Sequence, residues 1–179
     1  SGLTAAEWYH TDVPRKVMKD LMARKDGPAI RDTVLFYGLM ILFAAIGIML
    51  WPSWWSAPAW LAYGVLYGSG SDARWHECGH GTAFRTPWMN NVVYQIASFM
   101  LMRNAATWRW SHARHHSETY FVGRDPEIAV MRPPEMAKIF LNFFGIVDVI
   151  RFFPTLVHNA LSGPTAAERT FVPESDWSK

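Results

Sequence analysis

Charged side chains are missing from a long internal stretch of this sequence. No Asp, Glu, Lys or Arg occurs between Asp32 and Asp72, and only 18% of all residues are charged, whereas a typical soluble domain has about 25%. One helix over this stretch would be roughly 58 Å long, nearly twice the ~30 Å hydrocarbon core of a bilayer. We therefore expect two membrane-crossing helices, over residues 33–51 and 54–70. A buried hairpin inside a large soluble protein is the alternative.

The segment between the two expected crossings combines helix-breaking and aromatic residues. Pro52, Ser53 and Pro58 interrupt the apolar run, and proline removes a helical hydrogen bond and clashes with the preceding turn. Tryptophan is enriched where lipid meets water, so the tryptophans around this turn place it at a membrane surface. They are Trp51, Trp54, Trp55 and Trp60.

Basic residues are absent from the loop between these crossings and frequent before them, between Arg15 and Arg31. Cytoplasmic flanks of membrane helices carry an excess of Lys and Arg. We therefore expect the N-terminus in the cytoplasm and the tryptophan-rich turn outside. The hairpin then returns the chain to the cytoplasm at Asp72, just before the first of the histidines described below.

The sequence has one cysteine, Cys78, and a net charge of only +2. A lone cysteine excludes a disulfide within the chain and suits a reducing compartment. So small a net charge gives no argument for nucleic acid as a partner. The first apolar run is too long and begins too late for a cleavable signal peptide.

The remaining segments are less apolar than the hairpin. Residues 86–102 are uncharged but contain Asn and Gln, which predicts a helix lying in the membrane interface. Residues 136–161 are rich in Phe, and Asp148 and Arg151 are three positions apart, which predicts an amphipathic interfacial helix followed by a loop. We expect an all-α membrane protein with a cytoplasmic segment 1–32, a transmembrane hairpin 33–71, a histidine-rich region 72–130, and an interfacial helix and tail 131–179.

Five of the 7 histidines lie in two short clusters. His76 and His80 are four positions apart, so on a helix they share one face with Cβ atoms about 5–6 Å apart. His112, His115 and His116 occupy positions i, i+3 and i+4 of a second helical face. Neutral imidazole binds iron, zinc, copper and nickel, so we expect all five to be metal ligands. Two unrelated groups of surface histidines are the alternative.

The first cluster also has the H-E-x-x-H pattern of zinc metallopeptidases, in which Glu77 would be the general base. The pattern is short and arises by chance, and Gly79 inside it weakens a helix by about 1 kcal/mol relative to alanine. A peptidase needs one further ligand, whereas the second cluster offers three, which favours more than one metal ion. A membrane zinc peptidase and a non-catalytic metal-binding fragment remain alternatives.

The clusters and their neighbours resemble the integral-membrane fatty acid desaturase and hydroxylase family. The resemblance covers most of residues 30–130, and it includes a membrane hairpin just before the first cluster. It is carried by three stretches, WHECGHG at 75–81, WRWSHARHH at 108–116 and DPE at 125–127.

The resemblance implies both a chemistry and its partners. In that family the histidines hold two irons at the cytosolic membrane face. There O2 and two electrons, from a ferredoxin, rubredoxin or cytochrome b5 type partner, produce an oxidant that removes hydrogen from an unactivated C–H bond of a fatty-acyl or other lipid-like substrate. Desaturation and hydroxylation begin with the same step. Carboxylates near the clusters are expected to orient the ligands, and the candidates are Glu77, Asp125 and Glu127. His10 and His158 are expected to be structural.

Members of that family also carry a third histidine box after a second membrane hairpin. No further H-x-x-H-H follows His116, so the chain is expected to correspond to the N-terminal half of such an enzyme. Two irons need about ten donor atoms, which is more than five histidines supply. We expect the chain alone to bind metal weakly and to be inactive.

Overall fold

The computed structural model describes residues 11–128 and 135–178, and these residues form helices and no strand. The expected all-α class is therefore confirmed. The helices are α1 (Arg15–Leu21), α2 (Asp26–Met49), α3 (Ser56–Val65), the π-helical η2 (Leu66–Gly70), α4 (Ser71–Gly79), α5 (Pro87–Met100), α6 (Ala105–Glu118), α7 (Met136–Phe143), α8 (Ile146–Ser162) and the 3₁₀ turns η3 (Glu168–Thr170) and η4 (Glu174–Asp176).

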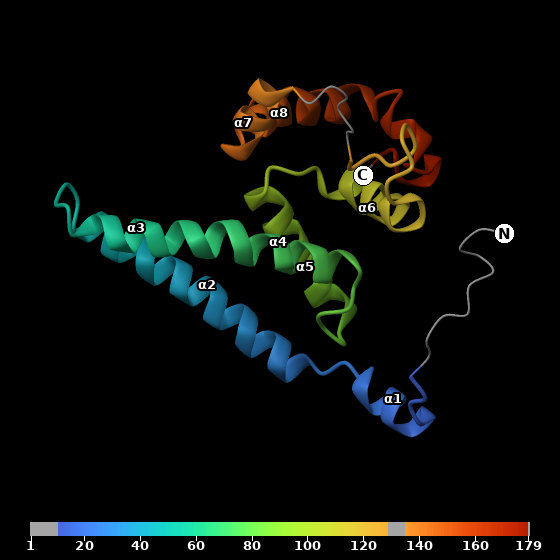
Figure 1. Cartoon of the computed structure of the whole chain (residues 1–179), viewed down its shortest axis with the longest axis horizontal. Coiled ribbons are helices and arrows are strands. Elements are labelled where there is room, and N and C mark those ends of the chain that lie inside the picture. Colours follow the sequence, from blue (N-terminus) through green and yellow to red (C-terminus); the bar gives the residue numbers. More distant parts are fainter. Residues whose placement is uncertain (1–10, 129–134, 179) are drawn as a thin grey trace.

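A long antiparallel pair, α2 and α3, leads into a group formed by α4, α5 and α6 (Figure 1). Gly47 of α2 packs so closely on α3 that a Cβ atom there would lie 2.7 Å from the ring of Trp60. α3 continues through η2 into α4 without a break in the helical path. Along this path Gly70 packs directly against the ring of Phe36. These contacts fix where the first histidine cluster lies relative to α2.

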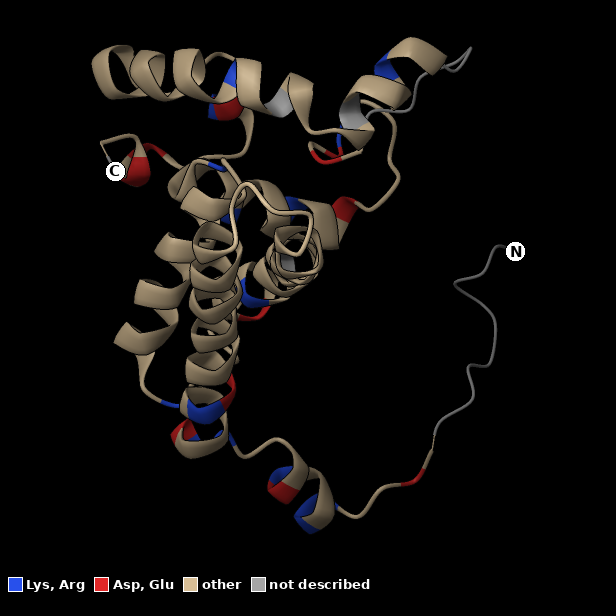
Figure 2. Cartoon of the chain, turned by 90° about the vertical axis from the view of Figure 1, so that its left-hand side faces the viewer, with Lys and Arg blue, Asp and Glu red and all other residues tan. Residues whose placement is uncertain are grey.

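Most apolar side chains of α2 and α3 point away from the rest of the protein. Only Phe36, Met40 and Gly47 of α2 are buried, whereas Ile41 and Leu61 are 70% and 71% exposed. Figure 2 shows these helices free of charged residues except near their ends. Among the described residues one helical stretch, Arg15–Met49, is long and apolar enough to cross a membrane. Because α3 itself has only 10 residues, the second crossing stays a prediction.

The main apolar core lies between α4, α5 and α6. α5 corresponds to the helix expected over residues 86–102, and it turns Val93, Tyr94 and Ala97 inward. Thr86, just before α5, donates from its backbone N–H and its hydroxyl to the carboxylate of Asp26 at 2.9 and 2.7 Å. The N-terminal end of α2 is thereby tied to the segment between α4 and α5. The buried core residues are Trp75, Cys78, Phe84, Val93, Tyr94 and Ala97.

The C-terminal region differs from the expectation of one helix and a loop. Gly145 adopts φ +66°, a left-handed conformation that ends a helix and favours glycine, so residues 136–161 form the two helices α7 and α8. The tail is not simply a loop, because it contains η3 and η4. The indole N–H of Trp110 on α6 donates to Asp176 at 2.9 Å, which fastens the tail to the second histidine helix.

Candidate metal centre

The first histidine pair lies at the C-terminal end of α4. Gly79 is the last residue of this helix, and a Cβ atom there would lie 3.1 Å from the ring of Tyr94. Glycine at this position therefore ends the helix and also allows α5 to approach it closely. His76 and His80 lie one turn apart, with ring centroids 4.9 Å from each other.

The second cluster is presented by α6. The side chain of Asn104 caps this helix by accepting hydrogen bonds from the backbone N–H groups of Ala106 and Thr107, a stabilisation typically worth about 1 kcal/mol. His112 and His116 are separated by one turn and have ring centroids 4.6 Å apart. Spacing at i and i+4 therefore places them on one face of α6, turned toward α4.

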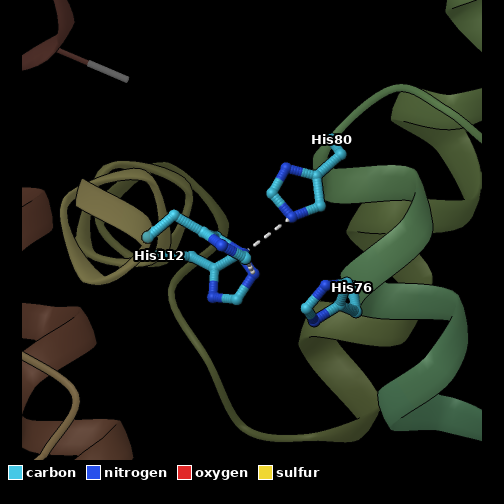
Figure 3. Close-up of side chains that lie close together, drawn as sticks. His76, His80 and His112 are labelled. Carbon is cyan, nitrogen blue, oxygen red and sulfur yellow. Dashed lines mark hydrogen bonds between the residues drawn. The ribbon is translucent and has the colours of Figure 1, made fainter. Parts of the chain in front are cut away.

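Four of the histidines meet in one place. Figure 3 shows the rings of His76 on α4 and of His80, which directly follows α4, facing that of His112 on α6. The Nε2 atom of His116 lies 3.1 Å from Nε2 of His112 and 3.2 Å from Nε2 of His80. Two imidazole nitrogens that share one metal ion at ~2.1 Å and a right angle lie about 3.0 Å apart. One potential ligand atom from each of these residues lies within 4.8 Å of the others, so the arrangement fits a transition-metal ion: His76, His80, His112 and His116.

His115 lies beside these four rather than among them. Its ring centroid is 5.8 Å from that of His116 and 6.0 Å from that of His112. Its Nδ1 atom donates to Oδ2 of Asp125 at 2.9 Å, which leaves Nε2 as its possible ligand atom. The fifth histidine is therefore a neighbour of the four and not a member of their group.

Two carboxylates stand behind the histidines of α6. Nδ1 of His112 donates to Oε2 of Glu127 at 3.2 Å, as His115 does to Asp125. Asp125 also accepts the backbone N–H groups of Tyr120 and Glu127, each at 2.9 Å. Asp125 thus folds the loop after α6 so that Glu127 reaches His112. A carboxylate on Nδ1 fixes the tautomer and leaves the Nε2 lone pair for a metal.

The electrostatics of the site favour the neutral forms of His80 and His112 beside an ionised Asp125. Burial, followed by the charges of the neighbouring histidines, lowers the pKa of His80. Burial also lowers the pKa of His112, although the hydrogen bond that His112 donates to Glu127 opposes this effect. Burial would raise the pKa of Asp125, but its hydrogen bonds with the backbone and with His115 hold that pKa at about 2. Only unprotonated imidazole binds a metal ion, so these shifts suit ligation.

The other candidates from the sequence lie elsewhere. Glu77 is half-exposed, and its ion pair is with Arg74 at 3.7 Å rather than with a histidine. Cys78 is buried in the core, and His158 is exposed on α8. His10 falls outside the described residues.

An aromatic wall that was not expected from the sequence lies beside the cluster. The ring of buried Trp75 lies 5.0 Å from that of His112 and 6.1 Å from that of Trp108. The guanidinium of Arg103 lies over both indoles, 4.2 and 4.8 Å from their centroids. The available signals were that Trp75 directly precedes His76 and that Trp108 lies one helical turn before His112. This wall keeps water from one side of His112.

Residues 49–178 match the family model for fatty acid desaturase. Because this match covers more than half of the chain, the chain belongs to the fatty acid desaturase family. The family resemblance stated for the histidine clusters is therefore confirmed.

Curated relatives are similar over parts of their length. An omega-6 fatty acid desaturase, endoplasmic reticulum isozyme 1, of Glycine max is 31% identical over 62% of this chain and 29% of its own length. A chloroplastic omega-3 fatty acid desaturase of Sesamum indicum is 28% identical over 86% of this chain and 34% of its own. An acyl-lipid (9+3)-(E)-desaturase of Dimorphotheca sinuata is 34% identical over 59% and 29%. The chain thus spans about a third of the length of these relatives. No solved structure matches it.

Proposed function

We propose that this chain supplies histidine ligands to a non-haem di-iron centre for the O2-dependent desaturation, or hydroxylation, of a fatty-acyl or other lipid-like chain. The observation that carries this proposal is the convergence of four imidazoles from α4 and α6 within 4.8 Å, in a chain of the fatty acid desaturase family. The proposed ligands are His76, His80, His112, His115 and His116.

The residues of the chain have distinct tasks in this proposal. When bound, iron supplies the activation of O2 and the removal of hydrogen from an unactivated C–H bond. Glu127 and Asp125 hold the Nδ1 protons of His112 and His115, so that both Nε2 atoms remain unprotonated for ligation. Trp75 limits access of water to the histidines from the side of the core. Cys78 is buried in the core and does not lie among the histidines. The proposed ligands therefore include no thiol, which suits an oxidising reaction.

The electron balance defines the partner. Removing two hydrogens from an acyl chain while O2 is reduced to two water molecules requires two further electrons and two protons. A small one-electron carrier of the ferredoxin, rubredoxin or cytochrome b5 type supplies those electrons in two steps. Its docking surface must lie on the same side of the membrane as the histidines.

The proposed setting is a membrane, with α2 and α3 crossing it and the N-terminus and histidines at the cytoplasmic face. The outward apolar side chains of α2 support this placement, as does the apolar length of Arg15–Met49. α5 and α8 would lie in the interface, and Val149, Phe153 and Leu161 of α8 are exposed apolar side chains that suit lipid. We propose the same four segments that the sequence predicts. They are a cytoplasmic segment 1–32, a transmembrane hairpin 33–71, a histidine-rich region 72–130, and an interfacial helix and tail 131–179.

A cobalt titration of the purified chain in neutral detergent tests the ligand assignment. Co²⁺ bound by imidazoles has visible absorption bands, so affinity and stoichiometry are read together. His80→Ala and His116→Ala should weaken binding at least about tenfold, since each removes a ligand of a shared ion. The matched control, His158→Ala, should leave binding unchanged. Equal effects of all three substitutions would overturn the assignment.

Turnover is tested separately by mass spectrometry of acyl chains, with O2, NADPH and each class of electron carrier. Loss of two hydrogens indicates desaturation, and gain of one oxygen indicates hydroxylation. Because five histidines supply too few donors for two irons, we expect no turnover by these 179 residues alone. Turnover by the purified chain would show that further ligands come from a second copy or from residues such as His158.

A further inference from the structure

The loop after α6, residues 119–127, carries the two carboxylates that contact His112 and His115. Near its end two successive backbone N–H groups both donate to the carbonyl oxygen of Phe121, each at 3.0 Å, so the loop turns back on itself. The carboxylates reach the histidines only while the loop keeps this fold. Whatever holds the loop therefore also determines how these two histidines are oriented.

One residue of this loop has a backbone conformation that large side chains rarely adopt. Tyr120 has φ +63°, in the left-handed region, where a bulky residue is an outlier. Its backbone N–H donates to Oδ2 of Asp125 at 2.9 Å, and the same oxygen accepts the Nδ1–H of His115. A residue in such a conformation is strained and persists only where surrounding contacts hold it. The hydrogen bond to Asp125 therefore needs support from other contacts of the loop.

Glu118, the last residue of α6, joins the helix to the loop. Its Oε2 atom accepts the Nε–H of Arg114 on α6 at 3.0 Å, and its Oε1 atom accepts an Nη2–H of Arg124 in the loop. Arg124 directly precedes Asp125. We call Arg114, Glu118 and Arg124 the clamp. It fastens the loop to α6 at the residue next to the carboxylate that orients His115.

The position of Glu118 is unfavourable for the helix alone. A negative charge in the last turn of a helix is disfavoured by the helix macrodipole, and Glu118 lies at the C-terminal end of α6. An ion pair with an exposed side chain also contributes little to stability, and the side chain of Arg124 is 61% exposed. The clamp is therefore better explained by the loop that it holds than by a gain in overall stability.

The other end of the clamp is fixed by the C-terminal tail. Nη1 of Arg114 donates to the backbone carbonyl oxygen of Thr170 at 2.9 Å and lies 3.3 Å from its hydroxyl oxygen. Arg114 is thus held by Glu118 through Nε and by η3 through Nη1. Because the guanidinium group is planar, these two contacts set the direction of its fork. The Glu118 carboxylate is thereby kept where Arg124 reaches it.

We propose that the clamp positions the histidines of α6, by holding residues 119–127 in the fold that brings a carboxylate to each of His112 and His115. Arg124 acts through Asp125, and none of the three clamp residues is itself a metal ligand. The proposal concerns the Nδ1 hydrogen bonds of the imidazoles and applies to the metal-free chain. Its consequence for metal binding rests on the proposed function.

The test determines which ring nitrogen of each histidine carries the proton. The full chain is labelled with ¹⁵N-histidine, treated with EDTA and held in neutral detergent at about pH 8, where histidine is neutral. Correlation NMR of ¹⁵N and ¹H then distinguishes Nδ1–H from Nε2–H. The signals of His112 and His115 are assigned with His112→Ala and His115→Ala.

The same measurement is made on variants of the clamp and on one matched control. The control, Arg31→Gln, breaks an exposed ion pair of arginine with carboxylate on α2, that of Arg31 with Asp32. Thermal unfolding and cobalt titration are measured on every variant. The clamp variants are Glu118→Gln, Arg124→Gln and Arg124→Lys.

In the native chain we expect both His112 and His115 to carry the proton on Nδ1. Arg124→Gln should move the proton of His115 in part to Nε2, because Asp125 is no longer held beside it, while its melting temperature matches that of Arg31→Gln. Arg124→Lys keeps the charge and should restore part of the Nδ1–H signal. Cobalt affinity should fall about fivefold in Arg124→Gln, which is less than the ten- to hundredfold typical of a group that contacts a ligand directly.

An unchanged His115 signal in both Arg124→Gln and Glu118→Gln would overturn the proposal. A lower melting temperature of Arg124→Gln without rescue by Arg124→Lys would also overturn it, since the contact would then be only structural. Arg124→Gln remains informative if Glu118→Gln fails to fold, because the side chain of Arg124 is exposed. Loss of the Nδ1–H signal with unchanged cobalt binding would support the clamp and count against the proposed function.

Discussion

Nδ1 of His112 lies 3.2 Å from Oε2 of Glu127, so the one buried histidine of the four-residue cluster is oriented by a carboxylate fifteen positions further along the chain. The hydroxyl of Ser111 donates to the other oxygen of Glu127 at 3.4 Å. Glu127 thus orients the proposed ligand His112, as Asp125 orients His115.

Glu127→Gln should lower metal affinity with little change in the fold. Carboxylates that orient a metal-binding histidine are typically worth ten- to hundredfold in affinity, and we expect an effect in that range in a cobalt titration. The control is Glu135→Gln, which alters an exposed carboxylate paired with Lys138. If both variants bind cobalt equally well, the contact with His112 does not serve metal binding.

His115→Ala should affect metal stoichiometry more than affinity. His115 lies outside the group of four and is held by Asp125, so we propose that it serves a second ion. Cobalt titration of His115→Ala should show fewer ions per chain but an unchanged affinity for the remaining ion. His112→Ala should weaken that affinity instead. The same loss of affinity in both variants would indicate a single set of five ligands.

Cys78 should resist alkylation in the folded protein. Burial, with a further contribution from the Glu77 carboxylate, raises the pKa of its thiol from the ordinary value of 9.0 to about 11. At pH 8 the reactive thiolate is then about a hundredfold rarer than in the unfolded chain. The pKa of this thiol is higher in the folded than in the unfolded chain. Its contribution to the free energy of unfolding is therefore fully present below about pH 9 and is lost as the pH rises toward 11. Maleimide labelling with and without denaturing detergent measures the difference, and equal rates would contradict the burial.

Local periodicity predicted the parts of the site that lie within one helix. The i, i+4 spacing of His76 and His80, and of His112 and His116, places each pair on one face because helical geometry alone determines it. The sequence also pointed to Asp125 and Glu127 as candidate partners, and each contacts a histidine of α6. The placement of side chains on one face of a single helix could therefore be inferred without a structure.

Features that depend on contacts between helices could not be inferred in this way. The wall formed by Trp75, Trp108 and Arg103 arises from the packing of α4 on α6. The break at Gly145 was missed because a lone glycine is tolerated within an amphipathic pattern, and only its positive φ shows that the helix ends there. Gly79 was interpreted as a weak helix residue, whereas it is the point at which Tyr94 approaches α4.

Two glycines of the hairpin should be intolerant of a methyl group. A Cβ atom at Gly47 would meet the ring of Trp60 at 2.7 Å, and one at Gly70 would meet the ring of Phe36. Overpacking of this kind costs about 1–3 kcal/mol, so Gly47→Ala and Gly70→Ala should unfold at lower temperature in detergent. Gly38→Ala and Gly64→Ala are the controls, because nothing lies within 4 Å of the added atom, and alanine favours a helix by up to about 1 kcal/mol. A similar melting temperature for all four variants would contradict the packing of α2 on α3.

The last prediction concerns which side of the membrane each end of the hairpin faces. If α2 and α3 both cross, a cysteine at Ser53 in the tryptophan-rich turn lies outside, and one at Ser117 on α6 lies in the cytoplasm. A membrane-impermeant maleimide added to intact cells should therefore label Ser53→Cys and spare Ser117→Cys, and both should react after the membrane is opened. Cys78 is the only native cysteine and is buried, so the unmodified chain supplies a low background and serves as the control. Labelling of Ser117→Cys alone in intact cells would reverse the orientation. Labelling of both variants would show that the apolar pair does not separate the turn from the histidines, and the cytoplasmic placement of the metal centre would then have to be abandoned.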